Sequence, residues 1–510
     1  MRNENIENLK PLSSVTIKMN IELTNDQKHA VKLAVKTLME PNSIFQISGP
    51  GGSGKTTIAK RIARKLLESQ TVVKIICCAP THKACKVLRE STKRFTQTIQ
   101  AFLNMEIEYD EKGRAKYVLS SPRLDTKKEE LEYNLTRNDV LSRTLIMIDE
   151  ISMVSDEICD TILKYKEKYG FRVITLGDSA QLPPVNQEKP AFYERFPIDV
   201  QFTENLRNSD VAYNKLLNRV RNMILQGETQ LKPFDVYCMM KDGQRAGVVD
   251  TCQHLLKGSN KHKELKTKSL RQAIKRIDFT KDLLLAYRTT STTSPTVTKL
   301  NKRSRRRLYG KDVDEYVTGE RLMVTGYISY CLLHDKYTHV CSDEQEIETS
   351  YQEHNEIRLN KCDDLIVVDV MKTKYAFYEK EFTTWRLLIQ TDDGVKFPIY
   401  RVIKKERDSF DKYKKEVWNE CRNECLLLSR DDRHKVWTRY YKNVNTIHAP
   451  VYYSYAMSVH MSQGSTTNDV YLYITDFLWL LYNPTPENTT LFLKLLYTGL
   501  SRAKSRAVVF

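Results

Sequence analysis

The chain has 510 residues, of which 41% are hydrophobic. This content is enough for packed cores and excludes a disordered protein, and the length predicts about three or four domains. Lys and Arg number 81 against 64 Asp and Glu, a formal excess of 17 positive charges, which suits a polyanionic partner. The first residues lack the apolar core of a signal peptide, and the longest strongly apolar run, 477–482, is far too short to cross a bilayer. We therefore expect a soluble, intracellular protein with no membrane partner.

The first informative segment is GPGGSGKTT, which follows the apolar run 44–47. Its glycines allow a tight loop with inward-pointing amide groups, and the next helix presents its positive dipole end to a phosphate. We expect Lys55 to reach the β- and γ-phosphates and Thr56 to ligate Mg²⁺. The alternative is a chance glycine turn, but the full match before the amphipathic segment 57–67 argues against it. The expected nucleoside triphosphate site comprises Gly49, Gly51, Gly52, Ser53, Gly54, Lys55, Thr56 and Thr57.

Three apolar runs that follow predict buried parallel strands: 72–79, 144–148 and 171–176. Residues just past such strands face the ligand crevice of the sheet. The second run leads directly into Asp149 and Glu150, which predicts that Asp149 holds Mg²⁺ and that Glu150 takes the proton from the attacking water. An acidic helix start is the alternative for this pair.

The third of these runs leads into GDSAQLPP, whose glutamine is Gln181. An amide at that place can contact both the γ-phosphate and the attacking water, and so can report hydrolysis elsewhere. The alternative is a proline-stiffened loop with an incidental glutamine.

In this order the segments resemble the superfamily 1B helicases, the branch of the Dda-like and RecD-like enzymes. The matching motifs run through nearly the whole chain, and this collinearity is more specific than any single motif. One departure is Met461, where the family usually has a lysine before Ser-Gln-Gly. The segments that carry the resemblance are 23–27, 49–57, 79–84, 98–103, 148–153, 176–185, 202–207, 459–466 and 497–504.

The resemblance implies an α/β fold with two RecA-like domains and with ATP and Mg²⁺ between them. It implies that Gln27 contacts the adenine base and that Gln463 and Gly464 belong to the nucleotide site. Arg207 and Arg502 would contact the γ-phosphate from the second domain, an effect worth about 10³ to 10⁵ in rate. As isolated residues these arginines would be solvated surface groups. The residues implied for strand contact are Pro80, Thr81, His82, Thr98, His460 and Thr466.

We expect the following domain limits: a first RecA-like domain at 1–200 with a hairpin insertion at 104–140, a second at 201–302 and 445–510, and an inserted 2B-type β-rich domain at 303–444. Alternation around Asp110–Gly113 predicts a hairpin over 105–118. The resemblance implies that this hairpin is a pin that splits the duplex, and a decorative surface hairpin is the alternative.

Within the inserted domain, four strand-like pieces suggest a small β-barrel: 321–330, 364–371, 386–390 and 395–403. The charged segment 404–442 is expected to be helical and has no further interpretation. Two basic runs, 257–276 and 299–307, predict either solvated faces or a groove for a nucleic acid strand.

The eleven cysteines lack C-x-x-C pairs, which indicates reduced thiols. Cys421, Cys425 and His434 are a weak candidate for a metal site, because one i,i+4 pair is little evidence. Only six residues follow Lys504, so we expect no further domain there. The compact layout fits a virus or phage.

The sequence thus predicts an ATP-dependent DNA helicase that acts as a monomer on single-stranded DNA and duplex junctions, with replication or recombination proteins as partners. The family implies 5′ to 3′ movement. One alternative is a superfamily 1 RNA helicase, but those enzymes usually carry an N-terminal cysteine-rich zinc module that is absent here. The other alternative is a non-catalytic nucleic-acid-binding subunit, which would have degraded ATPase residues.

Overall fold

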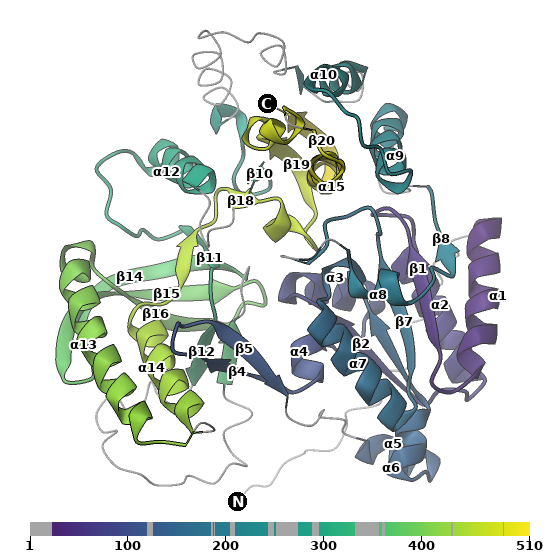
Figure 1. The fold of residues 1–510 in the computed structure, drawn as a ribbon, viewed down its shortest axis with the longest axis horizontal. Helices are drawn as coiled ribbons and strands as arrows, with labels where there is room; N and C mark the ends of the chain where they lie inside the picture. Colours follow the sequence, from purple (N-terminus) through teal and green to yellow (C-terminus); the bar gives the residue numbers. More distant parts are fainter. Residues whose placement is uncertain are drawn as a thin grey trace, which may run out of the picture.

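The fold is α/β, and its described residues contain two parallel sheets, one five-stranded antiparallel sheet and two antiparallel pairs of strands (Figure 1). It is seen in a computed structural model that describes residues 23–509 except 120–125, 185–186, 188, 205–209, 243–248, 251–273, 288–294, 332–355, 360–362, 430–431 and 483. Most of the basic run 257–276 lies outside the described residues. Among the helices that the described ranges contain, none is long and apolar enough to cross a membrane.

The first core is a six-stranded parallel sheet with the order β3-β2-β6-β7-β1-β8. One face carries an apolar cluster with α1 and α2, and the other carries a cluster with α4, α7 and α8. Because both faces are covered, its strands read as continuous apolar runs. The strands are β1 (Ile44–Ser48), β2 (Lys74–Ala79), β3 (Thr96–Thr98), β6 (Thr144–Ile148), β7 (Arg172–Gly177) and β8 (Val200–Gln201).

The helices of the first core include those that connect its parallel strands. They are α1 (Asn25–Met39), α2 (Lys55–Glu68), α3 (His82–Thr92), α4 (Ile99–Phe102), α5 (Lys127–Tyr133), α6 (Arg137–Ser142), α7 (Asp156–Tyr169) and α8 (Ala191–Arg195), with the 3₁₀ turn η1 (Ile151–Met153).

The second core is a five-stranded parallel sheet with the order β18-β10-β19-β20-β9. The apolar run 477–482 contributes to its buried cluster, which explains the hydrophobicity of that run. Its strands are β9 (Val249–Asp250), β10 (Leu283–Ala286), β18 (Met457–Ser458), β19 (Thr467–Leu472) and β20 (Ala503–Val509).

The helical elements of the second core are α9 (Val211–Leu225), α10 (Pro233–Asp242), α12 (Pro295–Tyr309), α15 (Pro486–Leu500), and the 3₁₀ turns η7 (His460–Ser462), η8 (Ile474–Asp476) and η9 (Leu478–Leu481). The expected domain limit at 200/201 falls inside β8, which pairs with β1 of the first core. The limit at 302/303 falls inside α12, whose Leu300 is buried with the second core.

The inserted region contains an antiparallel sheet with the order β16-β15-β14-β11-β17. Its two edge strands meet, because Ala449 N, just before β17, donates to Tyr400 O of β16 (2.9 Å), so the sheet curls in the manner of a barrel. The strands are β11 (Arg321–Val324), β14 (Asp364–Phe377), β15 (Lys380–Thr391), β16 (Lys396–Val402) and β17 (Val451–Tyr453), beside a ribbon of β12 (Ile328–Cys331) and β13 (Glu356–Leu359).

The strand expected over 321–330 is therefore two strands, β11 and β12. The break lies at Gly326, where an added Cβ would be 3.0 Å from the ring of Pro450. The chain passes so close to another backbone segment here that the extended run cannot continue in one sheet.

The segment 404–442 is helical, as predicted. After a 3₁₀ turn, η6 (Lys404–Glu406), it forms α13 (Arg407–Leu426) and the greater part of α14 (Arg433–Ile447). Cys421 and Cys425 are buried on α13, and His434 pairs instead with Glu108 (3.3 Å). No group of three potential ligands for a metal occurs among the described residues.

The predicted hairpin is present as β4 (Met105–Tyr109) and β5 (Ala115–Leu119), which pair antiparallel. It leaves the first core and packs against α14 of the inserted region (Figure 1). Tyr109 stacks on Tyr441 at 5.4 Å between ring centroids, and the Glu111 carbonyl accepts hydrogen bonds from Trp418 Nε1 and Tyr441 OH. The two charged helices thus brace the hairpin, a role that the sequence did not reveal.

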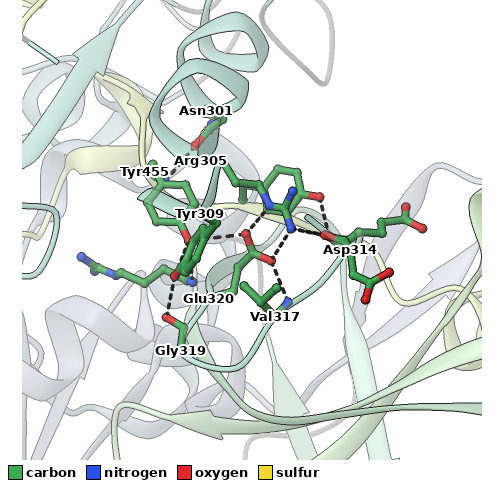
Figure 2. A network of polar contacts seen from close by, with 11 residues as sticks. Asn301, Arg305, Tyr309, Asp314, Val317, Gly319, Glu320 and Tyr455 are labelled. Carbon is green, nitrogen blue, oxygen red and sulfur yellow. Dashed lines mark hydrogen bonds and ion pairs between the residues drawn. The ribbon is translucent and has the colours of Figure 1, made fainter. Parts of the chain in front are cut away.

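A buried polar network joins the inserted sheet to the second core at the point where the chain crosses between them (Figure 2). Glu320 is completely buried and accepts hydrogen bonds from Arg305 Nε of α12 (2.5 Å) and from Tyr455 OH (3.4 Å). The Oδ1 of Asn301, also on α12, accepts from the backbone N–H groups of Tyr455 and Ala456. Both crossing segments are therefore tied to one helix.

Candidate functional site

The predicted phosphate loop connects β1 to α2 and has the backbone that its glycines allow. Gly52 and Gly54 have φ values of 84° and 86°, which favour glycine. A Cβ at Gly49 would lie 2.8 Å from the Cβ of Phe202. These positions cannot carry a side chain without displacing the loop, so its amides stay available to a phosphate.

The charged side chains of the first core meet beside this loop. Lys55 Nζ donates to the carbonyls of Gly49 (2.8 Å) and Pro50 (2.9 Å), so its ammonium lies over the loop. Burial and the neighbouring Glu150 raise the pKa of Asp149, whereas Lys55 and a hydrogen bond with Thr56 lower it. The adjacent carboxylates thus lie where a cation would stabilise both.

Glu150 adopts φ 52° and ψ 44°, a left-handed conformation that is uncommon outside glycine. Its backbone N–H donates to Asp149 Oδ1 (2.8 Å). A strained residue that the surrounding structure holds in place is frequent at functional sites.

Three buried side-chain oxygens of this region have no hydrogen-bond partner among the described residues: Ser53 Oγ, Ser152 Oγ and Gln181 Oε1. Unsatisfied buried acceptors and donors are costly unless a ligand or water pairs with them. Together with the glycine loop and the paired carboxylates, they fit a bound nucleotide with Mg²⁺, which Thr56 and Asp149 would hold.

A small pocket at the other end of the loop contains Gln27. Gln27 Nε2 donates to the Ser53 carbonyl (3.2 Å), and its Oε1 accepts from Thr24 N (3.2 Å) in a capping box at the start of α1. This arrangement holds the carboxamide against the phosphate loop. The pocket is lined by Thr24, Asp26, Gln27, Ser53, Phe202, Thr203 and Glu204.

The second core contributes Arg502, which is 4% exposed. Its guanidinium donates to the carbonyls of Thr498 and Ser465 and to Ser501 Oγ, and not to the phosphate loop. One of these partners borders the first core, because Leu182 N donates to Thr498 Oγ1 (3.3 Å). Arg502 therefore lies at the seam between the cores but is held by its own core. Arg207 lies outside the described residues.

Gln463 and Gly464 also border the seam. Gln463 Nε2 donates to the Leu182 carbonyl (2.9 Å), next to Gln181. Gly464 has φ 74°, and a Cβ there would lie 3.2 Å from Ala84 Cβ and 3.4 Å from Thr81 Oγ1. The structure thus brings Gln463 to the loop after β7 and Gly464 to the start of α3.

Sequence reasoning missed a buried contact across the seam. Asp178, directly after β7, is 1% exposed and pairs with Arg221 Nε of α9 (3.3 Å). Tyr497 OH of α15 donates to its other oxygen (2.5 Å). The residues around Arg221 in the sequence do not indicate that it has a buried partner. Asp178, however, lies three residues before Gln181 and could have been predicted as a functional residue on that ground.

The expected strand contacts of the first core lie at the carboxyl ends of two neighbouring strands, β2 and β3. Thr81 Oγ1 accepts from Ala84 N and caps α3, and Thr98 Oγ1 accepts from Ala101 N and caps α4. Pro80 precedes the first of these caps. Both helix N-termini therefore open at one edge of the sheet, where backbone N–H groups favour phosphate.

His82 lines a pocket of about 160 Å³ between α3 and the inserted sheet. An ion pair of Lys83 with Asp364 joins the two elements there. In the second core, His460 lies in η7 with its ring centroid 6.3 Å from that of Tyr287, and Thr466 precedes β19. The structure places His460 and Thr466 at the carboxyl end of β18 and the start of β19, respectively.

Comparison with known proteins gives two family matches. Residues 22–226 match an AAA domain, and residues 453–510 match a UvrD-like helicase C-terminal domain. The first match contains the phosphate loop and both carboxylates, and the second contains Arg502.

Several proteins are similar to this chain. An uncharacterized protein of Acanthamoeba polyphaga mimivirus is 24% identical over 95% of this chain and 98% of its own length. The ATP-dependent DNA helicase dda of Enterobacteria phage T4 is 26% identical over 42% of this chain and 49% of its length. The RecBCD enzyme subunit RecD of Buchnera aphidicola is 30% identical over 32% of this chain and 27% of its length. The matched region thus spans about half of the phage protein and about a quarter of RecD.

Among solved structures, a Pif1 helicase from Candida albicans aligns with this chain at a TM-score of 0.43 and 14% identity. The alignment covers 96% of this chain and 94% of the Candida protein. A Bacteroides Pif1 helicase in complex with ADP-AlF3 and ssDNA has a TM-score of 0.43 and 15% identity, with coverage of 96% and 92%.

Proposed function

We propose that this chain, which belongs to helicase superfamily 1B, uses ATP hydrolysis to move 5′ to 3′ along single-stranded DNA and to unwind duplex DNA. The observation that carries the proposal is the seam next to Gln181. Leu182 bonds there to both Gln463 and Thr498 of the second core. A change at the phosphate loop can therefore shift the second core through this loop.

The first core supplies the groups for hydrolysis. ATP, when bound, would supply the phosphoryl group that is transferred to water, and Mg²⁺ would neutralise charge on its phosphates. Lys55 is the cation for the β- and γ-phosphates, and Thr56 and Asp149 hold the metal. Glu150 accepts the proton of the attacking water. Gln181 orients that water.

The second core supplies Arg502, and the family pattern adds Arg207. Arg502 must exchange its bonds to Thr498, Ser501 and Ser465 for the γ-phosphate, which a small closure of the seam would permit. Closure of the domains around nucleotide then makes the site competent. The energy of closure is what moves the strand.

The DNA strand would cross the first core over Pro80, Thr81, His82 and Thr98 and the second core over His460 and Thr466. These six residues are taken from the family motifs. The hairpin of β4 and β5 would act as the wedge at the duplex junction. Its packing on α13 and α14 supports this role, since a wedge must resist the force of the strands. We propose that the protein acts as a monomer on single strands and junctions, with replication or recombination proteins as partners.

A strand-displacement assay with 5′ or 3′ overhangs, on DNA and on RNA, tests the proposal. We expect ATP-dependent displacement of DNA with a 5′ overhang. Glu150→Gln should keep nucleotide binding and lower turnover by about 10²- to 10⁴-fold, because it removes the proton acceptor.

Each alternative has its own outcome in the same assay. A preference for 3′ overhangs would reverse the polarity, and equal displacement of RNA would favour an RNA helicase. Absence of strand-stimulated ATPase in the wild-type chain would favour a non-catalytic subunit.

A further inference from the structure

Three aromatic side chains lie together at the carboxyl edge of the second parallel sheet. Tyr287 directly follows β10, His460 follows β18, and Trp479 lies in η9, which comes after β19. The Tyr287 ring centroid is 6.3 Å from that of His460 and 6.5 Å from that of Trp479. These strands are neighbours in the sheet, and ligands bind at this edge of parallel sheets.

Trp479 is exposed where its neighbours are not. Leu478, Leu480 and Leu481 are 1–2% exposed and belong to the core, whereas Trp479 is 50% exposed. Its large ring is half-exposed and lies against Tyr287, which also contacts His460.

The aromatic cluster is held in place by Asp476. One carboxylate oxygen accepts from Tyr287 N (3.0 Å) and the other from Thr296 Oγ1 at the start of α12 (2.6 Å). Tyr473 N also donates to the Leu285 carbonyl of β10 (2.8 Å). The loop that carries Trp479 is therefore fixed to both β10 and α12, so little conformational entropy would be lost when a ligand binds.

The adjacent helix is strongly basic. Helix α12 contains no acidic residue, and its side chains of Lys299, Lys302, Arg303 and Arg306 are exposed. Arg303 is close enough to Tyr473 to lower the pKa of that tyrosine, against the larger effect of burial. An anionic ligand is therefore attracted to the side of the molecule where the aromatic cluster lies.

We propose that Trp479, supported by Tyr287 and His460, is a stacking platform for an unpaired base of a single-stranded nucleic acid. This inference rests on the proposed function. A flat, half-exposed ring suits a motor, because every base has a π-face and stacking does not depend on sequence. The basic helix attracts the phosphates, and the ring holds the base.

The experiment measures the binding of oligo(dT) by tryptophan fluorescence. The chain has four tryptophans. Trp385 and Trp437 are only 7% and 5% exposed, and Trp418 is partly buried with its Nε1 bonded to the Glu111 carbonyl, so Trp479 is the ring best placed for quenching by bases. We expect oligo(dT) to quench the wild-type fluorescence and to cause little quenching in Trp479→Phe. Trp479→Ala should weaken oligo(dT) binding by about 5- to 150-fold, the range measured for stacked bases.

The matched control is Tyr482→Ala, which removes an aromatic ring of similar exposure, 57%, three residues away. We expect it to change binding by less than about twofold, since no ring contact links it to the cluster in the described part of the chain. An oligonucleotide with abasic sites separates base from phosphate contacts. The wild type should bind the abasic oligonucleotide more weakly than the normal one. Trp479→Ala should bind the abasic oligonucleotide nearly as well as the wild type does, because the base that the ring would hold is missing.

Unchanged oligo(dT) binding in Trp479→Ala, or full fluorescence quenching in Trp479→Phe, would overturn the platform. The proposed function would still stand if the wild type showed strand-stimulated ATPase activity. An equal loss of affinity for normal and abasic strands in Trp479→Ala would also overturn it, because the ring would then act on the phosphates or on the fold. Absence of both oligo(dT) binding and stimulated ATPase in the wild type would instead refute the proposed function.

Discussion

The seam between the two cores and the joint to the inserted sheet use the same chemistry, a buried acid held by an arginine and a tyrosine. At the joint, Glu320 binds both Nε and Nη2 of Arg305 and also accepts from Val317 N and Tyr455 OH. The same Nη2 of Arg305 also donates to the carbonyls of Asp314 and Glu315. The buried carboxylate of Glu320 therefore accepts four hydrogen bonds.

The seam is less complete. Asp178 accepts from Arg221 Nε (3.3 Å), Tyr497 OH and Ala180 N, but Arg221 Nη2 is buried with no hydrogen-bond partner among the described residues. Satisfied polar networks rigidify a structure, whereas an unpaired buried donor is costly. The comparison indicates that the inserted region is fixed to the second core and that the seam is the place where the molecule can move.

The largest expected effect is on the seam, in Arg502→Ala. Turnover should fall by about 10³-fold or more, because an arginine that reaches the transferred phosphoryl contributes at least that much. Nucleotide affinity should change far less, since the first core supplies most contacts. Steady-state ATPase rates and nucleotide titration measure the two quantities. An equal loss of both would show that Arg502 binds nucleotide without acting in turnover.

The joint should respond through stability, in Glu320→Ala. Removing one partner of a buried ion pair leaves the other charge unpaired and costs about 3–5 kcal/mol. Urea unfolding monitored by circular dichroism measures the loss. Glu320→Gln is the milder control, because it retains most of the volume. If Glu320→Ala unfolds like the wild type, the joint is not the rigid element that the hydrogen bonds indicate.

A smaller effect is expected for Tyr497→Phe at the seam. Loss of its hydrogen bond to a charged group corresponds to about 1.5–3 kcal/mol. Because the seam moves in our proposal, this loss should appear chiefly as a change in strand-stimulated turnover and less in the free energy of unfolding. The ratio of stimulated to basal ATPase activity is the measurement. If Tyr497→Phe instead lowered the free energy of unfolding as much as Glu320→Ala and left the ATPase ratio unchanged, the seam and the joint would not differ in the way proposed.

The smallest effect concerns acid sensitivity of the inserted region. Burial, and then the charges of Arg401, Arg407 and Lys414, lower the pKa of His448 to about 2. The unfolded chain takes up a proton below about pH 6.5 and the folded chain does not, so this stability contribution is present above pH 6.5 and is lost as the pH falls. Between pH 6.5 and 5 the loss should be about 1–2 kcal/mol. Urea unfolding of His448→Gln at both values should show a drop smaller by that amount.

Local patterns in the chain were enough for the nucleotide half of the site. The strand predicted at 144–148 has those limits in the structure, and the predicted tight loop is present, with positive φ angles at Gly52 and Gly54. A strand, a tight turn and the start of a helix depend on neighbouring residues, so their order in the sequence carries the information. The same holds for the helices within 404–442, whose charge and periodicity are local properties.

The partners of these elements could not be predicted in the same way. Asp178 and Tyr497 are 319 residues apart, and Glu111 and Tyr441 are 330 apart. No periodicity relates such residues, since their contact depends on how whole elements pack.

The sequence by itself determined the central strands of the first parallel core and the phosphate loop, because backbone preferences and buried runs act over a few residues; the second core was implied by the order of the family motifs. Only the tertiary structure decided that α13 and α14 brace the hairpin, that Arg502 is held by its own core, and that Trp479 faces solvent beside Tyr287. Those outcomes depend on which surfaces meet and which polar groups find partners after packing, and distant parts of the chain contribute to each of them.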